Sequence, residues 1–171
     1  MSGEADRPRT ADHAPESWSE IDFRSMQLAL EQARAAELIG EVPVGAVVVD
    51  ASGELVGVGH NRVITDSDPT AHAEIVAMRR VGALLENYRM PGLRVYVTLE
   101  PCAMCAMAMI HARIEEVTYA TADPKTGACG SVFDLVDDPR HNHRVRLRSG
   151  LLAAEASQML SGFFRARRTR V

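Results

Sequence analysis

The sequence predicts an α/β protein: a three-layer α/β/α sandwich around a mixed five-stranded sheet. Two strand-like runs flank a tight turn at residues 50–53, which indicates an antiparallel hairpin. From residue 69 onward, helical segments alternate with strand-like runs, and strands joined through helices lie parallel. A hairpin and parallel strands in a chain of 171 residues give a mixed sheet, covered by helices, within one domain.

The N-terminal part is predicted to form a helix and the hairpin. Ser17-Trp18-Ser19-Glu20 fits a capping box that opens a helix, and Gly40 is a natural stop. The apolar run 44–49 is typical of a buried strand, and residues 54–61 form a second strand weakened by two glycines. Residues 1–16 are polar and aperiodic, so we expect a disordered tail followed by a single domain over residues 17–171.

The remaining elements alternate along the chain. Helices are predicted over 69–86 and 101–112, each with a proline at its start, and strands over 93–99 and 116–122. These are followed by a loop at 123–131, a short helical piece near 132–136, a short strand at 145–148 and a final helix from residue 152.

Charge is distributed unevenly along the chain. The net charge is −4, yet residues 144–171 hold seven arginines against one acid, a balance of +6, which leaves −10 for residues 1–143. A positive cluster attracts phosphate backbones. An arginine-rich helix end is also favoured by the helix dipole alone, and composition leaves both interpretations open.

The sequence shows no apolar run of the ~20 residues that a membrane helix needs, and its start lacks the apolar core of a secretory signal. Of three cysteines, two form a metal-type C-x-x-C pair, and Cys129 has no partner at ligand spacing. Free thiols suit a reducing compartment, so we expect a cytoplasmic protein without membrane contact.

The most informative feature is a set of metal-type ligands at two predicted helix starts. His72-Ala73-Glu74 opens one helix, and Cys102 and Cys105 open the next. One imidazole and two thiols leave the fourth tetrahedral position of zinc open, as in catalytic zinc sites. Parallel strands bring both helix starts to one sheet edge, where α/β folds bind ligands. The pattern predicts a catalytic zinc site in which Glu74 takes and returns protons.

Other interpretations of these residues stay open at this point. An H-x-E triplet is common by chance, and a C-x-x-C pair also occurs in structural zinc sites and redox motifs. A structural site needs a fourth ligand, but Cys129, His111 and His143 do not stand at ligand spacing. A redox role would leave His72 and Glu74 without a function.

The order H-x-E followed by P-C-x-x-C is the signature of zinc nucleobase deaminases, and many further segments carry a narrower pattern. They are 41–47, 61–62, 68–74, 87–89, 97–102, 104–106, 109–114, Asp123, 125–128, 142–145, 163–165 and 167–168. Through them, the chain from about Trp18 to Arg168 resembles the bacterial tRNA-specific adenosine deaminases of the TadA type, within the cytidine and deoxycytidylate deaminase superfamily. The resemblance implies a cytidine-deaminase-like fold.

The resemblance also implies a reaction: hydrolytic deamination of the wobble adenosine (position 34) in a tRNA anticodon to inosine, with release of ammonia. It implies one Zn2+ per subunit held by His72, Cys102 and Cys105, with Glu74 as the catalytic acid and base. The implied partners are a tRNA anticodon stem-loop and a second copy of the chain in a homodimer.

Six side chains are implied as tRNA contacts: Asn61 and Val44 at the flipped nucleotide, Asp123 and Lys125 in a loop facing the anticodon, and Phe164 and Arg165 on the last helix. From the residues alone, Asn61 is equally a turn residue, Val44 a core residue and Lys125 a solvated loop residue. Phe164 lies off the apolar stripe of the final helix, unlike Phe163, so it is the one placed to stack on a base.

Two positions depart from the family pattern. Met107 stands where the family usually has glycine, and Cys129 where it commonly has alanine. If position 107 faces a subunit partner, the dimer packing must differ; if it faces the pocket, activity is affected. Two other functions are compatible with the zinc motif: deamination of a free nucleobase or nucleoside of the guanine or cytosine type, and a non-catalytic zinc-bearing RNA-binding subunit.

Overall fold

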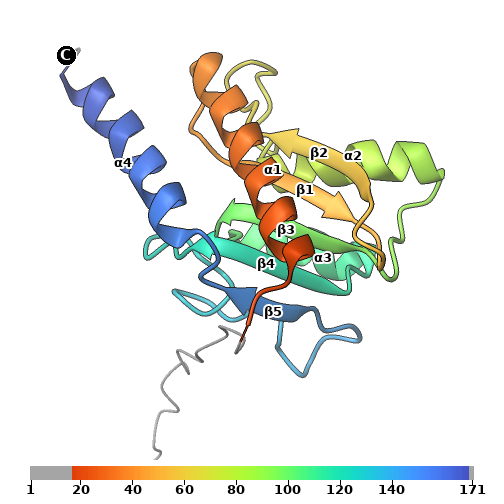
Figure 1. Cartoon of the computed structure of the whole chain (residues 1–171). Helices are drawn as coiled ribbons and strands as arrows, with labels where there is room; N and C mark the ends of the chain where they lie inside the picture. The colour runs from red at the N-terminus through yellow and green to blue at the C-terminus, as the bar shows by residue number, and fades with distance from the viewer. Residues whose placement is uncertain (1–16, 170–171) are drawn as a thin grey trace, which may run out of the picture.

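The computed structural model describes residues 17–169, so the predicted tail over residues 1–16 lies outside the described part (Figure 1). Within that part, no helix combines the length and apolar character needed to cross a bilayer. The elements follow in the order α1 (Glu20–Leu38), β1 (Gly45–Val49), β2 (Leu55–His60), α2 (Ala73–Leu85), β3 (Arg94–Leu99), α3 (Ala103–Ala112), β4 (Glu116–Thr121), β5 (Arg146–Ser149) and α4 (Ala153–Arg168).

The five strands form one mixed sheet, as the sequence predicts, and their order is β2-β1-β3-β4-β5. β1 runs antiparallel to both β2 and β3, while β3, β4 and β5 are parallel. The parallel strands end at the same edge of the sheet, so the segments that follow β3 and β4 start side by side. This edge is where the site described below is built.

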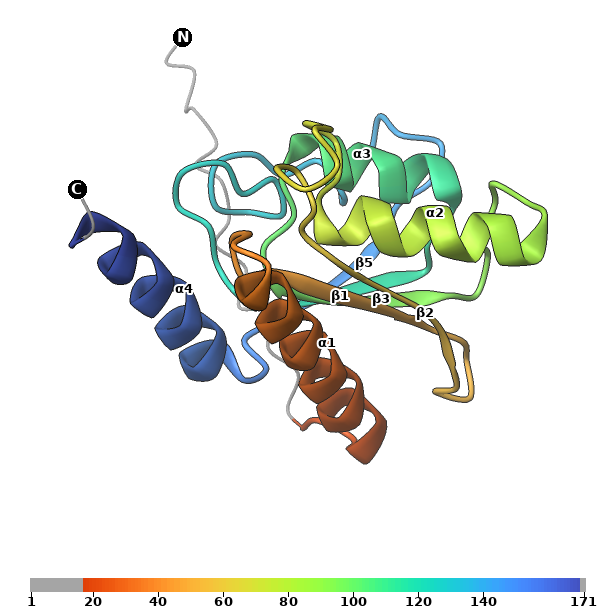
Figure 2. The ribbon, with the colours of Figure 1, turned by 90° about the horizontal axis from the view of Figure 1, so that it is seen from above.

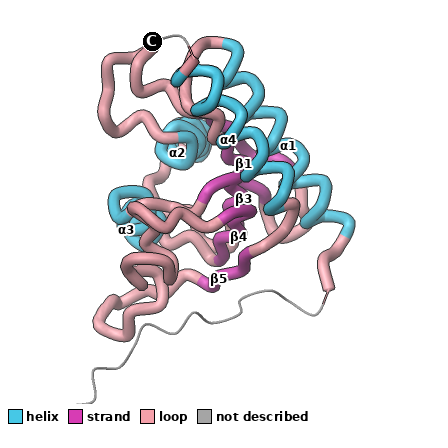
Figure 3. Tube along the Cα trace, turned by 90° about the vertical axis from the view of Figure 1, so that its left-hand side faces the viewer, coloured by secondary structure: helices cyan, strands magenta, loops and turns pink. Residues whose placement is uncertain are grey.

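Helices cover both faces of the sheet: α2 and α3 lie on one side, α1 and α4 on the other (Figures 2 and 3). Alternate residues of β1 divide between two apolar clusters because successive strand side chains point to opposite faces. Ala46 and Val48 pack with α2 and α3. Val47 and Val49 pack with α1 and the start of α4. The predicted three-layer sandwich is confirmed.

The N-cap of the first helix lies two residues after Ser17, the residue that opens the predicted capping box. Ser19 is its N-cap, and the backbone N–H of Asp22 donates to the Ser19 hydroxyl at 3.2 Å while the Ser19 N–H donates to the Asp22 carboxylate at 2.8 Å. The predicted pairing of Ser17 with Glu20 is therefore wrong. Asp22 is preferred because its carboxylate is also held by Tyr96 from β3 (2.7 Å).

Two further boundaries differ from the prediction. Residues 69–72 form no helix, because the Asp68 carboxylate accepts bonds from the Thr70 N–H (2.8 Å) and hydroxyl (2.6 Å) and fixes a turn. α2 consequently starts after His72. The predicted helical piece near 132–136 is wrong as well: this segment pairs with the preceding loop through a bridge between Cys129 and Asp134.

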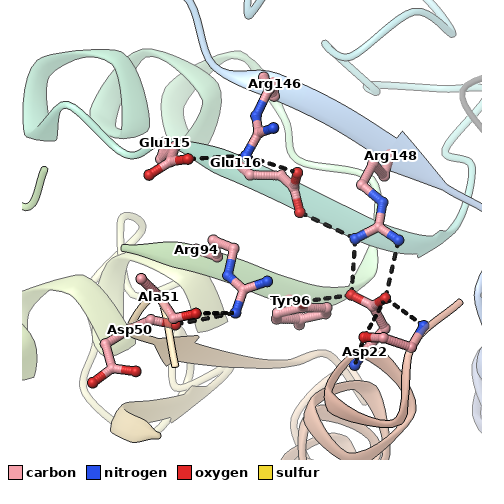
Figure 4. A network of polar contacts seen from close by, with 10 residues as sticks. Asp22, Asp50, Ala51, Arg94, Tyr96, Glu115, Glu116, Arg146 and Arg148 are labelled. Atoms are coloured by element: carbon pink, nitrogen blue, oxygen red, sulfur yellow. Dashed lines mark hydrogen bonds and ion pairs between the residues drawn. The ribbon is translucent and has the colours of Figure 1, made fainter. Parts of the chain in front are cut away.

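The edge strand β5 is tied to the rest of the fold by ion pairs (Figure 4). Arg148 contacts Asp22 at the start of α1 (2.8 Å) and Glu116 at the start of β4 (3.2 Å). Arg146 contacts Glu115 (2.9 Å). These arginines therefore fasten β5 between α1 and β4.

Candidate active site

Three potential metal ligands meet at the sheet edge where β3 ends. His72 is the N-cap of α2 and Cys102 the N-cap of α3, both with extended backbone, and Cys105 lies one turn into α3. All three ligand atoms lie within 4.8 Å of one another. The predicted convergence of the two helix starts is confirmed.

The distances between these atoms fit a tetrahedral zinc ion. His72 Nδ1 lies 3.5 Å from the Cys102 Sγ and 3.6 Å from the Cys105 Sγ. Zinc bonds of about 2.0–2.1 Å to nitrogen and 2.3 Å to sulfur, at a tetrahedral angle, place the nitrogen and sulfur roughly 3.5–3.6 Å apart. Among residues 17–169, no fourth His, Cys, Asp or Glu joins the group. A structural four-ligand site is therefore not formed by the described residues.

The protonation of the cluster also fits a cation site. A hydrogen bond from Cys105, together with His72, lowers the pKa of the Cys102 thiol to about 4 despite burial. The hydrogen bond to Cys102 and burial raise the pKa of Cys105. Zinc binds cysteine as the thiolate, so metal binding at this pair releases protons.

Glu74 lies beside this cluster, in the first turn of α2, and only 4% of it is exposed. Burial raises the pKa of its carboxyl to about 7. His72 as N-cap and Glu74 two residues later both line one cavity of about 130 Å3. A carboxyl group with a pKa near neutrality is suited to take and return protons.

Three of the predicted substrate contacts line the same cavity: Asn61, Val44 and Asp123. The side-chain oxygen of Asn61 accepts the backbone N–H of Ala73 at 3.1 Å, so its amide nitrogen is left as the group available to a ligand. The Asp123 carboxylate is occupied within its own loop, accepting the Lys125 N–H (2.9 Å) and the Thr126 hydroxyl (2.8 Å).

The other three predicted contacts lie outside the cavity, in a neighbouring groove of about 400 Å3. Lys125, Phe164 and Arg165 line it, and Ser161 and Arg168 complete it. Phe164 is 45% exposed, whereas Phe163 is 7% exposed and packs in the core, as predicted. The groove combines three cationic side chains with an aromatic ring and has no acidic lining residue.

The arginines near the C-terminal end divide between two places, which composition alone did not reveal. Arg144, Arg146 and Arg148 precede α4 and each contacts a carboxylate. Arg165 and Arg168 lie on α4 and form no ion pair among the described residues. Since Arg167 donates to the Gly40 carbonyl, Arg165 and Arg168 are the two arginines of this region, among those the structure describes, that can meet a phosphate without losing a protein contact.

Sequence reasoning missed several residues of the site: the cavity is also lined by Val42, Leu99, Glu100 and Thr126, and the groove by Ser161 and Arg168. Glu100 immediately precedes the Pro-Cys motif, and Thr126 follows Lys125. Their position next to predicted site residues in the sequence could have identified them. Met107 is half-buried against the core on the α2–α3 side and does not line the cavity. Cys129 is fully buried.

Fold and site together define a zinc-dependent deaminase. The sequence profile of the cytidine and deoxycytidylate deaminase zinc-binding region matches residues 19–121. A tRNA-specific adenosine deaminase from Haemophilus influenzae is 51% identical over 88% of this chain and 87% of its own length. The chain belongs to the cytidine and deoxycytidylate deaminase family, within its branch of tRNA-specific adenosine deaminases.

Solved structures agree with this placement. A tRNA:A34 deaminase that carries out A-to-I editing at the wobble position of transfer RNA matches with a TM-score of 0.77 and 42% identity, covering 80% of this chain and 99% of that one. A guanine deaminase from Nitrosomonas europaea matches with a TM-score of 0.68 and 25% identity, covering 86% and 85% of the two chains.

Proposed function

We propose that this chain hydrolyses the wobble adenosine of a tRNA anticodon to inosine, with release of ammonia. The observation that carries the proposal is the position of the buried Glu74. It lies beside the ligand cluster of His72, Cys102 and Cys105, in a cavity next to a cationic groove. The cavity of about 130 Å3 is below the roughly 300–1,000 Å3 of drug-sized sites, so it suits one base rather than a whole nucleotide.

His72, Cys102 and Cys105 would hold the zinc ion. When bound, zinc activates water for attack at neutral pH. Glu74 takes a proton from the attacking water and delivers it to the purine ring nitrogen beside C6. Glu74 then supports loss of the amino group as ammonia, so that one water is consumed for each adenosine. The buried setting of Glu74 keeps its carboxyl close to the pKa that this exchange requires.

The remaining lining residues position the base. The free amide nitrogen of Asn61 is a hydrogen-bond donor to the purine or its ribose, and Val44 closes the cavity as an apolar wall, 5% exposed. A base enters such a site only after leaving its stack, because the reacting carbon is inaccessible within stacked nucleotides.

The groove beside the cavity supplies the contacts that a free base would not need. Lys125, Arg165 and Arg168 are suited to phosphates, and Phe164 to stacking on an adjacent base. This groove favours a tRNA over a free nucleobase or nucleoside as substrate.

We further infer that the chain acts as a homodimer in the cytoplasm, with residues 17–171 as one domain. Exposed apolar side chains on and beside α2 support a subunit contact: Ile64, Leu84, Leu85 and Tyr88 are 45–68% exposed. A tRNA substrate and three free cysteines fit the cytoplasm. Sedimentation analysis of the purified chain tests the dimer, because a monomer at all concentrations would contradict it.

The substrate class is tested by incubating the purified zinc-loaded chain with total tRNA, an anticodon stem-loop, guanine and cytidine. We expect inosine at the wobble position of tRNA, with turnover that falls steeply as salt rises. Faster turnover of a free base, with little salt dependence, would overturn the proposal in favour of a nucleobase deaminase.

A further inference from the structure

Glu100, at the end of β3, is a buried carboxylate whose hydrogen bonds all run to one loop. It is 2% exposed. Among the described residues, its oxygens accept four hydrogen bonds, all from residues 123–131. The donors are the backbone N–H groups of Asp123 (2.9 Å), Cys129 (3.0 Å) and Ser131 (3.1 Å) and the Ser131 hydroxyl.

The loop held by Glu100 carries parts of both proposed binding surfaces. Asp123 and Thr126 line the cavity, whereas Lys125 lines the groove. The loop also packs directly on the carboxylate: a Cβ added at Gly127 would lie 2.4 Å from the Glu100 Cδ. The position of Lys125 relative to the cavity therefore depends on a contact made at the two ends of the loop.

The arrangement requires a carboxylate rather than any polar group. Oε1 accepts the Cys129 and Ser131 N–H groups, and Oε2 accepts the Asp123 N–H and the Ser131 hydroxyl. Glutamine has the same shape but only one accepting oxygen, so two of the four donors would face an NH2 group. A buried donor without an acceptor is costly, and the loop would move to satisfy it.

We propose that Glu100 is a positioning residue for RNA recognition. By holding both ends of residues 123–131, it sets Thr126 against the cavity and Lys125 in the cationic groove. This inference rests on the proposed function in tRNA deamination. Glu100 acts through the loop and contacts neither a metal ligand's side chain nor the catalytic Glu74 among its hydrogen-bond partners.

Glu41 provides a matched control. It is also 2% exposed and also anchors a loop, through the N–H (2.7 Å) and hydroxyl (2.9 Å) of Thr65. Both bonds reach the same oxygen, Oε1, and a glutamine supplies that oxygen unchanged. Glu41→Gln should therefore be tolerated where Glu100→Gln is not.

The test compares wild type, Glu100→Gln and Glu41→Gln by three measurements: steady-state kinetics with tRNA, zinc content, and hydrogen exchange of the amides of Asp123, Cys129 and Ser131. For Glu100→Gln we expect faster exchange of these three amides and a KM about 10-fold higher, the loss expected when about one hydrogen bond's worth of RNA contact is weakened. We expect kcat and zinc content to change little, because none of the four hydrogen bonds of the Glu100 carboxylate involves Glu74 or the side chain of a zinc ligand. Glu41→Gln should match wild type.

A wild-type KM and wild-type amide exchange in Glu100→Gln would overturn the inference. Loss of zinc from that variant would overturn it too, since Glu100 would then support the metal ligands instead of the loop. If the wild-type chain forms no inosine, the proposed function fails separately. Amide exchange and titration with an anticodon stem-loop RNA then decide whether Glu100 holds the loop for RNA.

Discussion

Arg148 places both terminal guanidinium nitrogens against the carboxylate of Asp22, which precedes it by 126 residues. The two distances are 2.8 and 3.0 Å, and the Asp22 side chain is 4% exposed (Figure 4). Tyr96 donates to the same carboxylate from the central sheet. One acidic group thus joins the first helix to the last strand across the sheet.

This contact predicts a specific loss of stability in acid. Burial alone would raise the pKa of Asp22, but hydrogen bonds from Arg148 and Tyr96 outweigh it and hold the pKa well below its usual range. The stability from Asp22 is therefore complete above its unfolded-state pKa of about 3.9 and is lost as pH falls through the lower folded-state pKa. Asp22→Asn should lower the free energy of unfolding at pH 7 by roughly 3 kcal/mol, measured by urea denaturation, with a smaller difference in strong acid.

Asp137→Asn is the matched control. Asp137 is exposed and lies 3.4 Å from Arg144, so its loss should cost less than about 1 kcal/mol. Equal effects of the two substitutions at pH 7 would show that the Asp22 contact contributes no more than a surface pair.

The arginines of α4 should differ in their effects on tRNA binding. Arg165 and Arg168 line the cationic groove, so replacing each by glutamine should weaken tRNA binding and reduce the slope of log K against log salt by roughly 0.7–0.9 per residue. Arg167 instead donates to the Gly40 carbonyl (2.7 Å) and covers the Phe163 ring. Arg167→Gln should keep the wild-type slope, and a slope lowered only in that variant would refute the assignment.

Removal of the metal should destabilise the protein as well as inactivate it. Metal bound only to the folded chain stabilises it by mass action, so a strong chelator should lower the unfolding temperature reversibly. Cys102→Ser should lose zinc and lose this response to chelator. Cys129→Ala should keep both, because Cys129 is buried outside the ligand group. Zinc retained by Cys102→Ser, measured by elemental analysis, would remove Cys102 from the ligand set.

The zinc ligands were predictable because their geometry is local. His72 and Cys102 each stand at a helix start after a strand, and Cys105 follows one turn later. Because β2 and β3 both run antiparallel to β1, the segments that follow them leave the same edge of the sheet. The sandwich and strand directions followed from the same alternation. Lys125, Phe164 and Arg165 were assigned to RNA by resemblance, and the structure places them in one groove.

Contacts between distant segments were not predictable. Asp22 pairs with Ser19 in the capping box because Arg148 and Tyr96 hold the Asp22 carboxylate, and neither residue is close to Asp22 in sequence. Arg146 and Arg148 of β5 looked like part of one electropositive end, yet their carboxylate partners come from α1, β4 and the residue before β4. The segment 132–136 was expected to be helical, but it pairs instead with the loop after β4 through the bridge between Cys129 and Asp134.

The most direct measurement is inosine formation on tRNA by Glu74→Gln, with zinc content and tRNA affinity determined on the same preparation. The substitution keeps the shape of a side chain that is 4% exposed and removes its ability to exchange a proton. We predict a fall in deamination of at least about 10²–10⁴-fold, with zinc and tRNA binding retained. Activity within a few-fold of wild type in a zinc-loaded variant would contradict the account.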